Sequence, residues 1–360
     1  MTHREVPENK AHVSVDLSGF SLPARGEHPR VSDAVRRRLD TIHLLFSKGK
    51  FSQALSLAEH LQRSIGRAQP PPIAAPIRGL TATVRLAQGD FESSESDLLE
   101  ALAAAKEGRI LTSPLGTSLM NNLAVISFVF RERPDSAEDQ FNQALKFIPS
   151  PDADELSQRT VCFRNLGIVQ ESQGRYNEAA RSLQQALQEV GQPSWHMVEV
   201  AGMLAANRER ARDVRAVEAI RTTLYELTAQ HRHNDPELFL LAARELGLFF
   251  LKTGELHRLG TVALAQVDEM NRLFPDNQRW QMISPLLWLA LYHGAEGRWS
   301  DADVYLKRAM GLSRQTPTGG LKAISILSGL LKFYDHAQND AAAAVVREAH
   351  RRASLRLNEP

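Results

Sequence analysis

The sequence predicts an all-α protein, built as an array of helix–turn–helix units, because two kinds of helix breaker alternate along it. Prolines recur at intervals of 37 to 44 residues, at Pro70, Pro114, Pro151, Pro193, Pro236, Pro275 and Pro317. Glycines fall between them, at Gly49, Gly89, Gly174, Gly254 and Gly297. Glycine supplies the positive φ that ends a helix in a turn, and proline cannot continue a helix but can begin one. Each unit of about 41 residues therefore holds two helices.

The segments between the breakers have the composition and periodicity of amphipathic helices. They are rich in Ala, Leu, Glu, Gln and Arg, which favour helices. In residues 176–190, apolar side chains recur every three or four residues and form one stripe, from Tyr176 through Ala179 and Leu183 to Val190. The alternation of β-branched residues that marks strands is scarce. We therefore expect roughly sixteen helices in an all-α fold.

Composition and charge exclude several classes of protein. The 360 residues include 43 Lys and Arg against 42 Asp and Glu, for a formal net charge of +1, which argues against a nucleic-acid-binding protein that relies on overall positive potential. The single cysteine, Cys162, cannot form an intramolecular disulfide, which fits a reducing cytosol. No uncharged apolar run approaches the roughly 20 residues that span a bilayer, and residues 1–30 lack the apolar stretch of a signal peptide. We expect a soluble, cytoplasmic protein.

One unit carries a pattern of small and aromatic residues, Asn165-Leu166-Gly167 followed by Gly174, Tyr176, Ala179, Leu183 and Ala186. The pattern recurs at Leu289-Ala290, Gly297, Trp299, Ala302, Leu306 and Ala309, and in part around Gly49, Gly89 and Gly254. In this pattern the chain resembles the tetratricopeptide repeat family. The units exceed the usual 34 residues of that repeat by about two helical turns, which is similar to the kinesin light chain type. The resemblance implies a right-handed superhelical α-solenoid of about eight repeats.

The breakers also set the expected boundaries. Residues 1–30 precede the first predicted helix and are expected to form a flexible tail. Residues 31–357 are expected to form the repeat array, with units at approximately 33–70, 72–113, 115–150, 152–192, 194–234, 236–274, 276–316 and 318–356. The unit at 194–234 matches the pattern poorly, and its register between Ala216 and Ala219 stays open.

In tetratricopeptide repeats the first helix of each unit lines a concave groove, so the resemblance implies where a partner would bind. Counting back from the turns places six residues on this groove, namely Asn122, Arg164, Asn165, Arg244, Glu245 and Trp288. An asparagine amide in mid-helix either binds the backbone of an extended peptide or bonds a neighbouring helix. The arginines pair either with a carboxylate of the partner or within the chain. Trp288 either anchors a partner or is buried by a tilt of its helix.

The sequence holds none of the common catalytic motifs. It lacks a dinucleotide-binding G-x-G-x-x-G after a strand, a P-loop, the zinc motif H-E-x-x-H and the nucleophile elbow G-x-S-x-G. His231 and His233 stand in an expected inter-repeat loop without a third ligand nearby in sequence. We therefore expect a protein that is not an enzyme and binds no cofactor or metal.

Two functions fit these observations. The first is a scaffold or adaptor that binds a peptide or helical segment of a partner protein in its concave groove. The alternative is a peptide-sensing regulator that switches partner binding by changing the conformation of the superhelix. Neither a nucleic acid nor a membrane is expected as a partner. The terminal repeat, with Val345 and Val346, is a candidate surface for self-association.

Overall fold

A computed structural model describes residues 33–65, 70–148, 153–191, 193–274, 280–315 and 322–356. Within these ranges the chain forms sixteen α-helices, and a short 3₁₀-helix, η2 (Trp280–Met282), leads into one of them. No strand occurs in the described residues. The fold is all-α, as predicted, whereas the predicted tail at 1–30 lies outside the described part of the chain.

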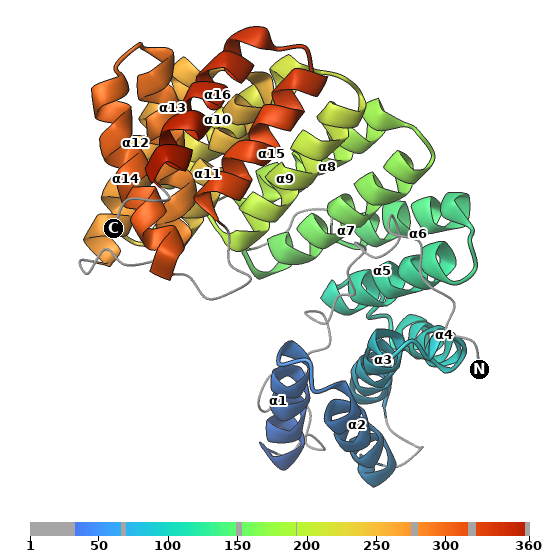
Figure 1. Cartoon of the computed structure of the whole chain (residues 1–360). Coiled ribbons are helices and arrows are strands. Elements are labelled where there is room, and N and C mark those ends of the chain that lie inside the picture. Colours follow the sequence, from blue (N-terminus) through green and yellow to red (C-terminus); the bar gives the residue numbers. More distant parts are fainter. Residues whose placement is uncertain are drawn as a thin grey trace. The chain divides into compact units, whose positions relative to one another are not determined.

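The helices are arranged in consecutive pairs (Figure 1). The first eight are α1 (Asp33–Ser47), α2 (Phe51–Ile65), α3 (Pro71–Ala87), α4 (Phe91–Glu107), α5 (Pro114–Val129), α6 (Pro134–Phe147), α7 (Ala153–Ser172) and α8 (Tyr176–Val190). The last eight are α9 (Trp195–Arg210), α10 (Val214–Gln230), α11 (Pro236–Thr253), α12 (Leu256–Leu273), α13 (Ile283–Ala295), α14 (Trp299–Gln315), α15 (Ala323–His336) and α16 (Asp340–Leu355).

The described residues form two compact units. The first takes in residues 1–192 and 199–213, and the second takes in 193–198 and 214–360, so the division falls within α9. In the first unit α5 packs against its pair partner α6 and also against α3 and α7, which are the first helices of the neighbouring pairs. In the second unit α13 packs in the same way against α14, α12 and α15. Each unit is therefore a stack of helix pairs with a continuous core, as repeat arrays build it.

A left-handed residue marks the turn inside each pair. The five predicted turn glycines, from Gly49 to Gly297, have φ between 69° and 80°. The other three turns hold Glu132, Arg212 and Gln338, with φ of 56°, 60° and 55°. A positive φ costs a non-glycine residue about 1–2 kcal/mol, so these three turns are held by the packing of the helices on either side.

Small side chains let the two helices of a pair approach each other. The third residue after the first residue of each second helix is buried, namely Ala54, Ser94, Ala137, Ala179, Val217, Leu259, Ala302 and Ala343. Opposite Ala179, on α7, stands Gly167. A Cβ atom built on Gly167 would lie 2.8 Å from Cγ of Leu183 and 3.2 Å from the carbonyl oxygen of Ala179. This crossing therefore leaves no room for a side chain on either helix.

The last helix pair packs back onto α11. Tyr334 of α15 is fully buried, and its hydroxyl donates a hydrogen bond to the carbonyl oxygen of Leu251, in the last turn of α11. Burial raises the pKa of Tyr334 and keeps this donor protonated. The side chain of Asn339, which caps α16, lies against Gly254. Val346 is buried by its own chain, and self-association of the terminal repeat stays a prediction.

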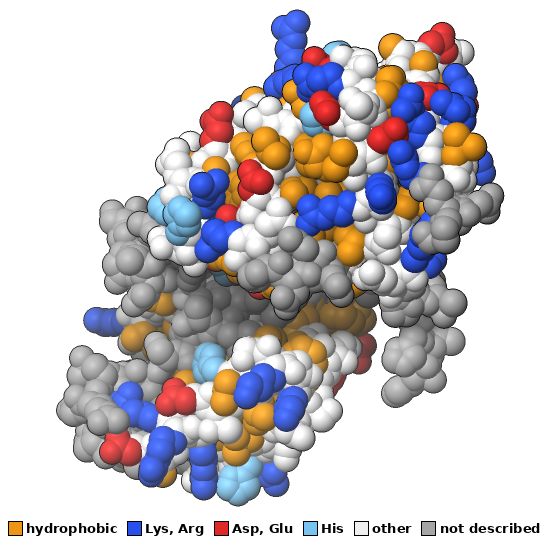
Figure 2. Space-filling view, turned by 60° about the vertical axis from the view of Figure 1, so that its left-hand side comes forward, with side chains coloured by type: hydrophobic (Ala, Val, Ile, Leu, Met, Phe, Trp, Pro, Cys, Tyr) orange, Lys and Arg blue, Asp and Glu red, His pale blue; other side chains and the backbone are white. Residues whose placement is uncertain are grey.

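Charges of both signs are interspersed on the surface. Figure 2 shows acidic and basic side chains side by side on the face that it presents, with a group of hydrophobic side chains in its upper part. The arginines of α16 are largely paired: Arg351 and Arg352 both bond Glu348, and Arg352 also bonds Asp303. The hydrogen bond from Arg351 lowers the pKa of Glu348 to about 2. The basic run at this end is thus neutralised by neighbouring carboxylates.

Candidate functional site

The two predicted groove asparagines are buried between helices instead. Asn122 of α5 donates to Oγ1 of Thr83 on α3 at 2.8 Å, and Asn121 donates to Oδ1 of Asn122 at 3.0 Å. Asn165 of α7 donates to Oδ1 of Asn121 at 3.0 Å, and the thiol of Cys162 lies 3.7 Å from the same oxygen. All five side chains are fully buried. The expectation that Asn122 and Asn165 face a partner is therefore wrong, because their amides link the first helices of three consecutive pairs.

Trp288 is also buried rather than displayed. It is 3% exposed, and its ring fills the space beside Gly247 of α11, where a Cβ atom would lie 2.3 Å from Cζ3. The tilt of α13 that the sequence left open is the one that turns the indole inward. The groove position expected for Trp288 is thus wrong.

Arg244 and Glu245 lie on α11 in the second unit. Arg244 is exposed and Glu245 is half-buried. Neither forms an ion pair or hydrogen bond through its side chain with another described residue. Both side chains are accessible, and a role in binding stays a prediction for them.

A register shared by three first helices locates a better candidate site. Arg164, Gly202 and Arg244 each stand ten residues before a turn residue with positive φ, at Gly174, Arg212 and Gly254 respectively. At this register α7 and α11 carry an arginine, whereas α9 carries a glycine. Gly202 is exposed, and a Cβ atom built on it would have no atom within 4 Å. The absence of a side chain on α9 therefore leaves open space beside α7.

That space is a cavity of about 360 Å³ between α7, the start of α8 and α9, all within the first unit. Its lining consists of Ile168, Glu171, Ser172, Tyr176, Glu199, Gly202, Met203, Ala206 and Arg210. Ile168, Met203 and Ala206 supply an apolar lining, and the carboxylates, the guanidinium and the hydroxyls supply polar groups. The sequence analysis missed this cavity, although a glycine in mid-helix, at the register of two arginines, was a signal for it.

Two ion pairs join α7 to α9 on either side of the cavity. Nη1 of Arg164 lies 2.8 Å from Oε2 of Glu199. Nη1 of Arg210 lies 2.7 Å from Oε1 of Glu171, which also accepts a hydrogen bond from Asn207 at 3.3 Å. Burial lowers the pKa of Arg164, against the attraction of Glu199. Arg164, expected to face a partner directly, is buried and instead holds a carboxylate that lines the cavity.

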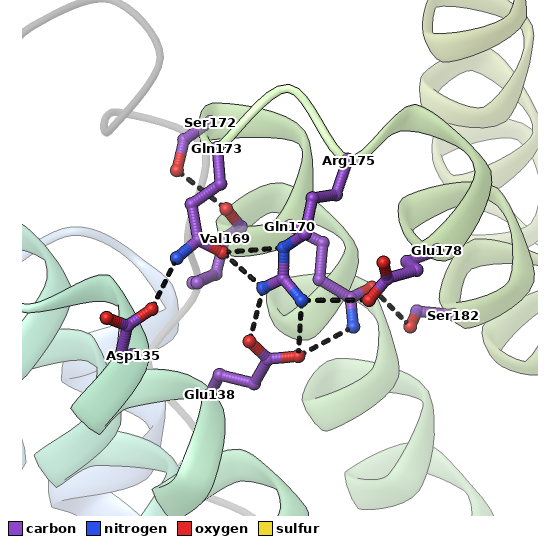
Figure 3. A network of polar contacts seen from close by, with 9 residues as sticks. All are labelled: Asp135, Glu138, Val169, Gln170, Ser172, Gln173, Arg175, Glu178 and Ser182. Atoms are coloured by element: carbon purple, nitrogen blue, oxygen red, sulfur yellow. Dashed lines mark hydrogen bonds and ion pairs between the residues drawn. The ribbon is translucent and has the colours of Figure 1, made fainter.

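A polar network fixes the turn between α7 and α8, which carries Tyr176 into the cavity wall (Figure 3). Arg175 pairs with Glu138 of α6 and, at 2.8 Å, with Glu178 of α8. Gln170 of α7 donates to Glu138 at 3.0 Å and accepts from Ser182 of α8 at 2.8 Å. Burial by itself would raise the pKa of Glu138, but the hydrogen bonds from Arg175 and Gln170 outweigh it and lower the pKa.

Other kinds of site were sought in the described ranges. No helix there combines the length and the apolar character that a membrane span requires. In the same ranges, no three His, Cys, Asp or Glu side chains are grouped so that they could hold a metal ion.

Stacked helix pairs, left-handed turns and small residues at the helix crossings define an all-α repeat protein. A family model described as "Tetratricopeptide repeat" matches residues 162–194, which include most of α7 and all of α8. The chain is a tetratricopeptide repeat protein. No curated protein sequence matches it.

Three solved structures illustrate the similarity of fold. The apo form of RapI is 10% identical, with a TM-score of 0.57 over 91% of this chain and 99% of that chain. A Signal Transduction ATPase with Numerous Domains protein from Pyrococcus horikoshii is 13% identical, with a TM-score of 0.55 over 88% of this chain and 45% of that chain. BtubC (BKLC) from P. vanneervenii is 21% identical, with a TM-score of 0.47 over 55% of this chain and 81% of that chain.

Proposed function

We propose that this protein is a non-enzymatic interaction scaffold that binds a peptide segment of a partner protein. In this proposal, the cavity between α7 and α9 holds one side chain of that segment. The observation that carries the proposal is the cavity itself, about 360 Å³ in volume, with an apolar lining and polar groups around it. Tetratricopeptide repeat proteins generally bind protein or peptide partners, which supports the same conclusion.

The chemistry of the cavity suits an anchoring side chain better than a reaction. Its volume is near the lower end of the roughly 300–1,000 Å³ of small-molecule sites, enough for one large apolar side chain. Glu171 and Glu199 are each paired with an arginine, so neither is poised as a free acid or base. Burying an apolar side chain against Ile168, Met203 and Ala206 would contribute about 1.5–3 kcal/mol.

The proposal is tested by filling the cavity from α9. In Gly202→Phe the new ring occupies the cavity. The matched control is Gly329→Phe on α15, because Gly329 is likewise an exposed helical glycine with no atom within 4 Å of its Cβ position. Both variants gain helix propensity, so both should fold.

Affinity capture from an extract of the source cells, read by mass spectrometry, then compares the wild type with the two variants. A protein held by the wild type and by Gly329→Phe, but lost by Gly202→Phe, supports the scaffold. Partners that Gly202→Phe retains in full contradict the assignment of the cavity as the binding site.

A second candidate function is the peptide-sensing regulator, which switches partner binding through a change of superhelix conformation. It is favoured by the fold similarity to the Pyrococcus horikoshii protein, which is described as having a tetratricopeptide repeat sensor. Hydrogen exchange with a captured peptide separates the two candidates. A scaffold predicts protection confined to α7–α9, whereas a sensor predicts changed exchange in α11–α16 as well.

A further inference from the structure

We propose that the cavity selects a segment in which one apolar side chain has a cationic group on one side and an anionic group on the other. This inference rests on the proposed function and specifies its ligand class. It follows from the two ion pairs between α7 and α9, which have opposite orientations with respect to solvent.

At one side of the cavity the accessible charge is negative. The side chain of Arg164 is 7% exposed, whereas that of its partner Glu199 is 47% exposed. The buried guanidinium therefore acts from below, and a ligand meets the carboxylate. A cationic group of the ligand fits there.

At the other side of the cavity the accessible charge is positive. The side chain of Glu171 is 19% exposed and also binds Asn207, whereas that of its partner Arg210 is 54% exposed. A ligand here meets the guanidinium, which suits a carboxylate. The neighbouring Arg208 is engaged elsewhere, because it donates to Asn177 and to the carbonyl oxygen of Tyr176.

The spacing of these charges fits a short extended peptide. Glu199 and Arg210 are eleven residues apart on α9, or about 16 Å along the helix axis. An extended chain covers that distance in about five residues. Gly202 and Ala206, which line the cavity, lie between the two charges. The apolar anchor therefore belongs two or three residues from each charged group of the ligand.

The test uses a phage-displayed peptide library with a fixed central leucine and five random residues on each side. It is selected in parallel on the full-length wild type, Gly202→Phe, Arg210→Gln and Arg131→Gln. Arg131 is the matched control, because its side chain is 42% exposed and pairs with the less exposed Glu95 of the preceding helix pair, as Arg210 pairs with Glu171. Sequencing counts the charges within three residues of the leucine.

We expect the clones that require Gly202 to carry a basic residue on one side of the leucine and an acidic residue on the other. Arg210→Gln should reduce the enrichment of the acidic residue by about two- to fivefold, the range that exposed ion pairs give. The basic residue should stay enriched, and Arg131→Gln should change neither.

Clones that require Gly202 but carry no such charge pair overturn the inference and leave the scaffold standing. So do clones that keep their acidic preference on Arg210→Gln. If every enriched clone binds Gly202→Phe as well as it binds the wild type, the scaffold assignment fails together with the inference.

Discussion

At the scale of single residues, helical glycines have opposite roles in the two units. Gly202 of α9 leaves the space that becomes the cavity, with no atom within 4 Å of its Cβ position. Gly247 of α11 stands at the neighbouring register but is covered by the ring of Trp288. The same residue type thus makes an open site in one place and a close packing contact in the other.

This difference predicts opposite effects of adding one methyl group. Gly202→Ala should raise the free energy of unfolding by up to about 1 kcal/mol, because alanine favours the helix and meets no obstacle. Gly247→Ala should lower it by about 1–3 kcal/mol, because the methyl group collides with Trp288. Urea denaturation followed by circular dichroism measures both. A destabilised Gly202→Ala would contradict the open space assigned to α9.

The buried asparagine ladder reverses an expectation drawn from the sequence. Exposed amides would leave stability unchanged when removed, but Asn122 is fully buried and bonds Thr83. We expect Asn122→Ala to lower the free energy of unfolding by about 1–3 kcal/mol, because it strands buried polar partners. Asn142→Ala, at an exposed position on α6, is the control and should change little. Equal stabilities of the two variants would show that the ladder is dispensable.

At the scale of helices and turns, the network around Arg175 ties α6 to α7 and α8 through Glu138 (Figure 3). The pKa of Glu138 is lowered in the folded protein. Its contribution to stability is therefore fully present above the unfolded pKa, near 4.3, and is lost as the pH falls through the folded value.

We accordingly expect Glu138→Gln to be less stable than the wild type at pH 7 but to lose less stability between pH 5 and pH 3. Glu92→Gln, which removes an exposed carboxylate of α4, is the control for a change of one surface charge. Free energies of unfolding from urea titrations at pH 7, 5, 4 and 3 test this. Parallel pH profiles for wild type and Glu138→Gln would exclude the carboxylate as a source of acid sensitivity.

The paired helices and their turns could be predicted from the sequence, whereas the facing of side chains could not. Gly174 and Gly254 end helices through backbone geometry that one residue determines by itself. Arg164 and Arg244, however, share a register, yet Arg164 is buried and Arg244 is exposed. The roll of a helix about its axis depends on the neighbours that it packs against, and their contacts are not periodic in the sequence.

At the scale of the whole molecule, the chain divides into two compact units within α9. Each unit has its own stack of helix pairs, and the contacts that bury Ala179 belong to the first. Stability in such arrays is carried by a repeat and its neighbours. A local disruption should therefore spread within one unit before it reaches the other.

We expect Ala179→Arg to destabilise the first unit selectively. The new side chain has no space at the crossing of α7 and α8, where Gly167 already faces Ala179, and the cost should exceed about 3 kcal/mol. Hydrogen exchange read by mass spectrometry should show faster exchange in α5–α8 than in the wild type, with α13–α16 changed much less. Gln184→Arg, on an exposed face of α8, introduces the same side chain without the collision and should exchange as the wild type does. Equal acceleration in both units would show that they unfold as one cooperative body.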